Sequence, residues 1–441
     1  MAAPERGAST RERRYGNAAP ARVLYPDADV TQGVTMESSN VRDAFDLTAG
    51  GGVRDPWTRL AGLRRSVGVV EGGLFQSPTA DDGSARFAVL RYDDCAHVLR
   101  DNATYSSTIY VDMMGPVMGH TILEMDEPEH KRHRNLAGHA FRQKTLQRWE
   151  DELIGPLAHE MIDAFAPRGR AELVSELTFP YPVQVIARIL GLPHEDYQHF
   201  QALAFTLTSV GAGYDAALDA SRELEAYLLP IVGARRADPR DDLISELATA
   251  EVDGEVLTDI EIVSYLRLLL PAGSETTYCS VGSLLLALLT HPDQLEETRA
   301  DRTLVPHAIE ELLRWEPAVP FIPRLAVRDS TVAGVEIPAG AHVTVCLGVA
   351  NRDETRFADP DRFDIHRRDQ QHLGFASGPH MCLGMHLARM EMRIVLNALL
   401  DRFPRIELDP GPPGTDTHDP HIHGFGFRSP TCVPVRFTPE G

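Results

Sequence analysis

The succession of helical segments between Pro128 and Trp315 is the feature that most constrains the fold of this chain. Apolar residues recur there with the 3.6-residue period of amphipathic helices. Proline-bearing connections separate several segments, as at Leu192-Pro193, His291-Pro292 and Glu316-Pro317. We predict helices over residues 128–142, 145–165, 183–191, 194–208, 214–235, 240–249, 258–290 and 303–315. The chain is therefore predicted to be mainly α-helical.

A smaller β part is predicted on both sides of these helices. A short helix over 55–66 precedes a β-hairpin made by 68–76 and 85–91, and 92–99 returns to helix. Residues 100–119 show no clear period, and Met113-Met114-Gly115-Pro116 indicates a loop. After the helical region we predict strands at 330–335, 342–347, 403–408 and 424–438, an irregular meander over 350–372, and a last helix after Cys382.

No repeat and no shift in composition divides the core, so we expect one domain over residues 41–441. Residues 1–40 are rich in Ala, Gly, Pro, Ser and Arg and lack any period, which predicts a disordered tail.

The overall charge and the cysteines exclude several classes of protein. The net charge is −21, from 43 basic and 64 acidic residues, which disfavours binding to nucleic acids and anionic membranes. The five cysteines are scattered and form no C-x-x-C pair, which is typical of a reducing compartment and not of disulfides or zinc. With no signal peptide and no apolar run of membrane-spanning length, we expect a soluble cytoplasmic protein.

Other motifs carry little weight. The G-x-G-x-x-A pattern from Gly211 to Ala216 has no strand before it, and the sequence contains no P-loop and no G-x-S-x-G. A metal could in principle be held by His418, His421 and His423, but we favour a polar surface loop there.

The stretch from Phe375 to Glu391 places a single cysteine, Cys382, between Gly378 and Gly384 and just before a helical pattern. The positive end of that helix would stabilise a thiolate. Glycine on both sides lets the backbone pass close to a flat, bulky group. The alternative is a buried structural cysteine at a helix entry.

The ten residues from Phe375 to Gly384 match F-x-x-G-x-[RH]-x-C-x-G at all five specified positions, and the stretch resembles the haem-binding loop of the cytochromes P450. The resemblance implies the mainly α P450 fold with a small β part, and haem b whose iron is ligated by the Cys382 thiolate. It also assigns haem contacts to Phe375, Gly378, His380 and Gly384.

The predicted long helix breaks helix rules at its centre, where Pro271 precedes Ala272-Gly-Ser-Glu-Thr-Thr277. Taken alone, a packing kink and a functional site explain this equally well. The pattern resembles the A-G-x-[DE]-T-[TS] element of the same family. On that resemblance Ala272 and Gly273 lie against the haem, Thr276 contacts the oxygen that is activated, and Glu275 belongs to the relay that brings protons.

Two further sets of residues follow from the resemblance. Haem propionates need cations and other donors, and the family pattern assigns this role to His130, Arg134, Arg324 and His380. The E-x-x-R pair of Glu311 and Arg314 is nearly uninformative alone. In relatives it forms a buried scaffold with the P-x-R-F element, which points to Arg362.

The resemblance implies a haem-thiolate monooxygenase that activates O₂ and oxidises an apolar small molecule. Electrons would come from NAD(P)H through a separate ferredoxin and ferredoxin reductase. We expect an acidic ferredoxin to meet a positive patch of Lys131, Arg132, Arg389 and Arg393. The alternatives are a peroxide-dependent or isomerising P450 and a catalytically inactive helper protein. The substrate pocket is expected to draw on residues 105–120, 200–215, 266–272, 319–322 and 424–427.

Overall fold

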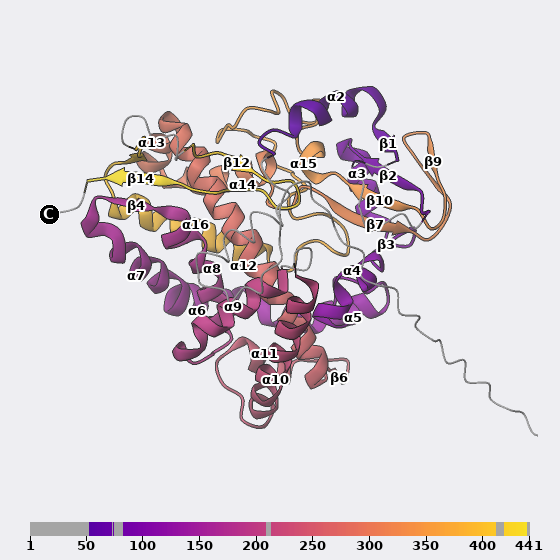
Figure 1. Cartoon of the computed structure of the whole chain (residues 1–441), viewed down its shortest axis with the longest axis horizontal. Helices are drawn as coiled ribbons and strands as arrows, with labels where there is room; N and C mark the ends of the chain where they lie inside the picture. The colour runs from indigo at the N-terminus through magenta and orange to yellow at the C-terminus, as the bar shows by residue number, and fades with distance from the viewer. Residues whose placement is uncertain (1–52, 73, 75–82, 209–212, 412–418, 439–441) are drawn as a thin grey trace, which may run out of the picture.

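The computed structural model describes residues 53–72, 74, 83–208, 213–411 and 419–438. Figure 1 shows two unequal parts, a sheet region with short helices around it and a larger helical region. The predicted mainly α fold with a small β part is confirmed. The expected tail, residues 1–40, lies outside the described residues. One domain over 41–441 stays a prediction.

The helices have the following bounds: α2 (Trp57–Val67), α3 (Tyr92–Arg100), α4 (Ile109–Met118), α5 (Glu129–Gly138), α6 (Gln143–Trp149), α7 (Gly155–Phe165), α8 (Pro180–Ile189), α9 (Tyr197–Thr208), α10 (Tyr214–Ala237), α11 (Leu243–Thr249), α12 (Asp259–Thr290), α13 (Pro292–Ala300), α14 (Val305–Trp315), α15 (Leu347–Ala350) and α16 (Met385–Arg402). A five-residue π-helical turn, Glu150–Ile154, separates α6 from α7, which had been predicted as one helix.

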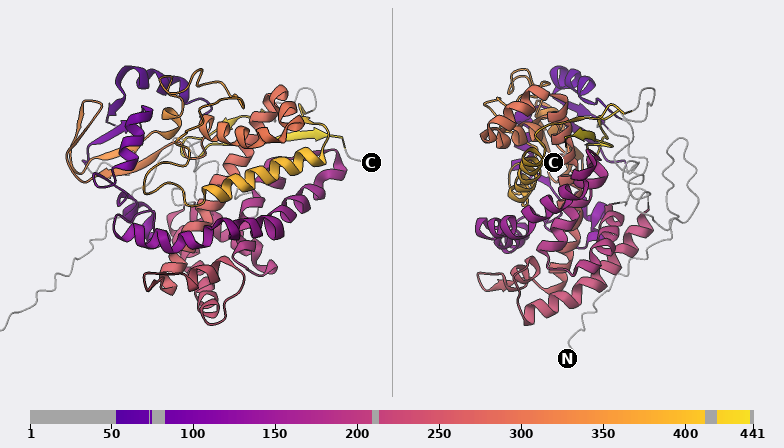
Figure 2. Two further views of the ribbon diagram at one scale, coloured as in Figure 1. Left: turned by 180° about the vertical axis from the view of Figure 1, so that it is seen from behind. Right: turned by 90° about the vertical axis from the view of Figure 1, so that its left-hand side faces the viewer.

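Helix α12 is the longest helix in the described part of the chain, with 32 residues, and it contacts α8, α10, α14 and α16. It begins with a capping box, because the side chains of Thr258 and Glu261 each accept from the other's backbone N–H. Pro271 lies inside the helix, which continues without a break. Helix α16 lies beside α7 (Figure 2), and the buried faces of these helices form the main core.

The strands are β1 (Val69–Glu71), β2 (Arg86–Val89), β3 (Tyr105–Ser106), β4 (Arg170–Glu172), β5 (Glu251–Val252), β6 (Glu255–Val256), β7 (Ile322–Ala326), β8 (Ser330–Val332), β9 (Val335–Ile337), β10 (His342–Val345), β11 (Ile406–Leu408), β12 (Ile422–His423), β13 (Ser429–Pro430) and β14 (Pro434–Phe437). The largest sheet has the order β1-β2-β10-β7-β3. The antiparallel pairing of β1 with β2 confirms the predicted hairpin over its described residues.

Several elements differ from the sequence-based expectation. Residues 109–118 form helix α4 where a loop was expected, because this segment packs on α10 and α12 and tertiary contacts outweigh the cost of Gly115 and Pro116. Pro292, expected to lie in a connection between helices, is the first residue of α13, a position where proline is favoured. Strand β7 tolerates Pro323 near its start, and the single strand expected at 330–335 is divided by a turn at 333–334 into β8 and the start of β9.

No helix among the described residues is long and apolar enough to cross a membrane.

Candidate active site

The Cys382 loop is closed by its own backbone. The Cys382 N–H donates to the Phe375 carbonyl at 2.9 Å, and the Met381 N–H donates to the Gly378 carbonyl at 3.1 Å. Helix α5 holds the same loop from outside, because Arg134 Nη2 donates to the Met381 carbonyl at 2.6 Å. The loop therefore presents Cys382 three residues before α16 begins.

Cys382 is the exposed one of the five cysteines. Burial nevertheless raises the pKa of its thiol, so the side chain is accessible but recessed in the protein. The Gly384 N–H and the guanidinium groups of Arg134 and Arg389 act against that rise in pKa. These groups suit a thiolate that a metal ion would stabilise further.

Gly378 and Gly384, the two glycines beside Cys382, have different structural roles. Gly378 has φ +77°, and a Cβ there would lie 2.5 Å from the Leu99 carbonyl, so its role is close packing on α3. At Gly384, by contrast, a Cβ would meet no atom within 4 Å, which leaves room for a flat group. Phe375 is half-buried and carries the Arg389 guanidinium 4.6 Å from its ring centre.

The four predicted propionate ligands come together in space. The rings of His130 and His380 lie 3.9 Å apart between centres. The pKa of His380 is lowered to about 3, first by burial and then by the neighbouring His130, Arg324 and Arg134. Burial likewise lowers the pKa of His130, so both imidazoles are neutral at neutral pH. The cluster thus has two permanent cations, on Arg134 and Arg324.

This cluster fits an anionic group. Among the described residues no carboxylate forms an ion pair with Arg134 or Arg324, and Arg324 is only 4% exposed. The Nε2 atoms of His130 and His380 are buried without a hydrogen-bond partner. Buried polar groups normally have hydrogen-bond partners, so these two atoms lack a partner that a bound group or an ordered water would supply. Together with the recessed Cys382 thiol, the residues fit a haem with two propionates.

Helix α12 carries an uncovered stripe in its middle. From Ile262 to Leu288 every residue is buried except Leu268, Leu269, Ala272, Gly273 and Thr276. These positions lie on one face of the helix, at i, i+1, i+4, i+5 and i+8. Of the two residues assigned to haem contact there, Ala272 is exposed. Gly273 also serves packing, because a Cβ would lie 2.9 Å from Ile186 Cδ1 of α8.

Glu275 and Thr276 stand at the end of this stripe. The Glu275 carboxyl is 4% exposed, and burial alone raises its pKa to about 8. The Thr276 hydroxyl donates to the Ala272 carbonyl at 2.7 Å, the local bond expected of a threonine inside a helix. A buried acid that is neutral at neutral pH thus directly precedes, in the helix, a threonine on the uncovered face.

The predicted scaffold is present with one changed member. Arg314 makes two hydrogen bonds of 2.8 Å to the Glu311 carboxylate, and neither side chain is exposed. The inclusion of Arg362 was wrong, because its side chain is 63% exposed and only approaches Asp364, at 3.9 Å. Arg367 takes that place, and its side chain is 8% exposed.

Sequence reasoning missed three contributors. Arg367 follows the Phe363-Asp364 pair by three residues, a spacing that could have indicated it. Tyr110 hydrogen-bonds Arg324 from helix α4, which was expected to be a loop. The Asn351 side chain bridges two backbone groups: its Oδ1 accepts from the Leu373 N–H at 2.6 Å, and its Nδ2 donates to the Leu313 carbonyl at 3.4 Å.

The described part of the chain contains no group of three or more side chains that could hold a metal ion, so His421 and His423 have no further ligand there. His418 lies outside the described residues.

The chain is similar to known proteins of one family. The sequence model described as Cytochrome P450 matches residues 194–431. Cyclomarin C epoxidase CymV of Salinispora arenicola (strain CNS-205) is 39% identical over 334 residues, 73% of this chain and 84% of that protein. Cytochrome P450 monooxygenase PikC of Streptomyces venezuelae is 37% identical over 372 residues, 81% and 86% of the two chains.

A solved structure agrees in fold. Cytochrome P450 CYP109Q5 from Chondromyces apiculatus superposes with a TM-score of 0.78 and 36% identity, covering 88% of this chain and 96% of that one. With the family model spanning more than half of the sequence, the chain belongs to the cytochrome P450 family and is a monooxygenase of the bacterial type.

Proposed function

We propose that this enzyme binds haem b through Cys382 and inserts an oxygen atom from O₂ into an apolar organic molecule. The proposal rests on one observation, the buried and neutral Glu275 carboxyl directly before Thr276, which lies on the uncovered stripe of α12. When bound, a haem with a thiolate ligand supplies the reductive activation of O₂. The names of CymV, an epoxidase, and PikC, a monooxygenase, support oxygen insertion.

The protein's own groups handle protons and exclude water. Because the pKa of Glu275 is about 8, its carboxyl holds a proton at neutral pH and can deliver it. Thr276 can turn its hydroxyl from the Ala272 carbonyl toward a bound reactant. A peroxide-dependent or isomerising enzyme has no need of this acid–hydroxyl pair, and an inactive helper has no need of Cys382. These residues favour the monooxygenase.

The side chains on the uncovered stripe of α12 support the proposal of an apolar substrate. Leu268, Leu269 and Ala272 have accessible surface, whereas Leu266 and Leu270 are fully buried in the core. Two other expected pocket segments meet at Phe321 and Phe425, whose rings stack 4.8 Å apart. Few polar groups belong to these surfaces, which favours hydrocarbon over charged ligands.

For electron delivery we propose a ferredoxin, reduced by its NAD(P)H-dependent reductase, that docks beside the helix after Cys382. A groove of about 610 Å³ lies there, lined by Phe141, Leu146, Ile309, Met390 and their polar neighbours. Of the four cations expected in a positive patch, three have acidic partners. Arg132 pairs with Glu255, Arg389 with Glu310 and Arg393 with Glu150, at 2.5 to 2.7 Å. Lys131 is exposed and makes no ion pair within the described residues.

The test is oxygen incorporation. Candidate molecules are first screened by the shift they cause in the ferric haem spectrum of the holoenzyme. A binding molecule is then turned over with ferredoxin, reductase, NAD(P)H and isotopically labelled O₂. We expect one labelled oxygen atom per product molecule. Product that forms only with added peroxide, or that carries no label, would contradict the proposal and favour the peroxide-dependent or isomerising alternative.

A further inference from the structure

A histidine pair on the C-terminal hairpin takes no part in the site described above. His423 on β12 lies directly opposite Ser429 on β13 in an antiparallel pair. Side chains directly opposite each other in such a pair project from the same face, as do residues two apart on one strand. His423 and Ser429 therefore share one face of the hairpin, and His421 lies just before β12.

This face packs against helix α12. The Ser429 hydroxyl donates to the Tyr278 hydroxyl at 3.3 Å and also hydrogen-bonds the Cys279 thiol. His423 is 5% exposed and Ser429 is 2% exposed. A row of polar, proton-bearing groups is thus buried in a seam between the hairpin and the helix.

The seam leads toward Glu275. Cys279 follows Glu275 by four residues, which places the two on one helix face, and they interact electrostatically. Thr178 Oγ1 lies in the same seam. A Cβ built on Gly282 of α12 would be 3.6 Å from Thr178 Oγ1 and 3.2 Å from Pro430 of β13, so both groups adjoin the helix at Gly282. This hydroxyl is fully buried and has no hydrogen-bond partner. An orphaned buried hydroxyl is the usual setting for an ordered water.

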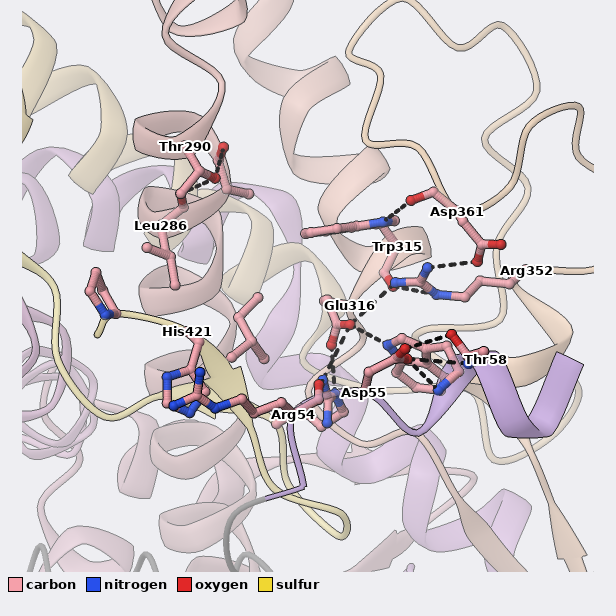
Figure 3. Close-up of a pocket in the computed structure, with 15 residues that line it drawn as sticks. Arg54, Asp55, Thr58, Leu286, Thr290, Trp315, Glu316, Arg352, Asp361 and His421 are labelled. Atoms are coloured by element: carbon pink, nitrogen blue, oxygen red, sulfur yellow. Dashed lines mark hydrogen bonds and ion pairs between the residues drawn. The ribbon is translucent and has the colours of Figure 1, made fainter. Parts of the chain in front are cut away.

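At its other end the row reaches a surface cleft of about 450 Å³. Figure 3 shows His421 in this cleft beside Arg54. His421 Nδ1 lies 2.6 Å from the Asp419 carbonyl, which can only accept, so Nδ1 carries the proton and Nε2 is left as a proton acceptor. The rings of His421 and His423 lie 5.7 Å apart between centres. One bridging water spans such a gap.

We propose that this hairpin face is a proton path, from the cleft through His421, His423 and Ser429 to Glu275, which rests on the proposed role of Glu275 as proton donor. For every proton that Glu275 gives up, His421 Nε2 takes one from cleft water and releases one from the same atom to the bridging water, because Nδ1 keeps its proton on the Asp419 carbonyl. His423 and Ser429 each accept a proton on a lone pair and release their own, so no charge is left behind. His423 suits this role because burial keeps it neutral, with a pKa of about 4.

The test follows proton exchange and needs no turnover. The resting ferric holoenzyme is moved from H₂O into D₂O, and the infrared band of the protonated Glu275 carboxyl, assigned by its loss in Glu275→Gln, is followed in time. We expect His423→Phe to slow the deuterium shift of this band on the order of 10²-fold, the lower range for loss of a proton-transfer group. His423→Gln, which keeps a hydrogen-bonding group, should restore much of the rate.

Ile422→Val is the matched control, because Ile422 lines the same cleft but carries no proton-bearing group, and it should exchange at the wild-type rate. Ser429→Ala leaves the hairpin backbone bonds in place and should also slow exchange, which covers the case that His423→Phe does not fold. Wild-type exchange rates in both His423→Phe and Ser429→Ala would overturn the path, as would the absence of any band that Glu275→Gln removes. Because the exchange needs no substrate or reductant, it is independent of whether oxygen insertion occurs.

Discussion

The guanidinium of Arg367 lies against the carboxylate of Glu311, with Nε 3.1 Å from both carboxylate oxygens. The same carboxylate holds Arg314, so two arginines share one buried acid. Their remaining N–H groups donate to backbone carbonyls of the irregular segment before the Cys382 loop, including those of Asn351 and Pro360 for Arg314. This irregular segment therefore depends on the shared carboxylate for its position.

Replacing Arg367 should destabilise the protein far more than replacing Arg362. We expect Arg367→Ala to lower the free energy of unfolding by ~3–5 kcal/mol, the usual cost of breaking one partner of a buried pair. Arg362→Ala should cost below ~1 kcal/mol, because that side chain is 63% exposed. Urea unfolding of the two variants measures both values, and similar losses would refute the assignment of Arg367.

Cys382→Ser should abolish thiolate ligation. The reduced wild-type protein with CO is expected to show the red-shifted Soret band of a thiolate-ligated haem, and the serine variant should lose it. Cys432→Ser, at a partly buried cysteine on the C-terminal segment, serves as the control and should keep the band. If Cys382→Ser retained the band, another cysteine would be the ligand.

Thr276→Ala should uncouple oxygen consumption from product formation. The threonine lies on the uncovered stripe, so its loss removes a hydroxyl from the reacting region but leaves the cysteine loop intact. We expect product formed per NAD(P)H consumed to fall severalfold, with the lost electrons recovered as peroxide. Thr290→Ala is the matched control, because Thr290 makes the same local bond, to the Leu286 carbonyl at 2.8 Å. Equal coupling in both variants would mean that Thr276 only supports the helix.

Glu275 should make stability fall as pH rises. Its pKa is raised from 4.5 in the unfolded chain to about 8 in the folded protein, so between these values the folded state binds more protons than the unfolded state. The stability linked to this carboxyl is thus fully present below about pH 4.5 and is lost as pH rises to about 8. The slope is at most ~1.4 kcal/mol per pH unit.

Glu275→Gln should remove this pH dependence. Unfolding by urea at pH 5.5 and 8.5, in the variant and the wild type, gives the comparison. We expect the gain in stability of the variant relative to the wild type to be larger at pH 8.5 than at pH 5.5. A constant difference between the two proteins across this range would mean that Glu275 is ionised in the folded state.

Reduction by an acidic ferredoxin should depend on Lys131 more than on exposed cations elsewhere. Lys131→Glu is expected to slow reduction severalfold at low ionic strength, and less at high salt where the Debye length falls below ~10 Å. Arg170→Glu is the control, since Arg170 is also exposed but lies on β4, away from α5. Stopped-flow reduction of the haem provides the rates. An equal effect of both substitutions would point to overall charge and not to a docking face.

Much of the site follows from local sequence, because its parts are short segments whose chemistry depends on near neighbours. The Cys382 loop closes through backbone bonds between residues three to seven apart. Glu311 and Arg314 meet because they are one helical turn apart. Glu275 and Thr276 share the middle of one long helix, which its apolar content predicts. Periodicity likewise predicted most helices, since each buries its own apolar face.

The contacts between distant segments were decided only by the tertiary structure. Arg367 reaches Glu311, and Glu310 and Glu150 neutralise Arg389 and Arg393, because folding brings side chains together across 56, 79 and 243 residues. Helix α4 forms since packing on α10 and α12 outweighs its weak local propensity. A charge or a helix end is read from sequence, but its partner depends on distances that exist only after the core has packed.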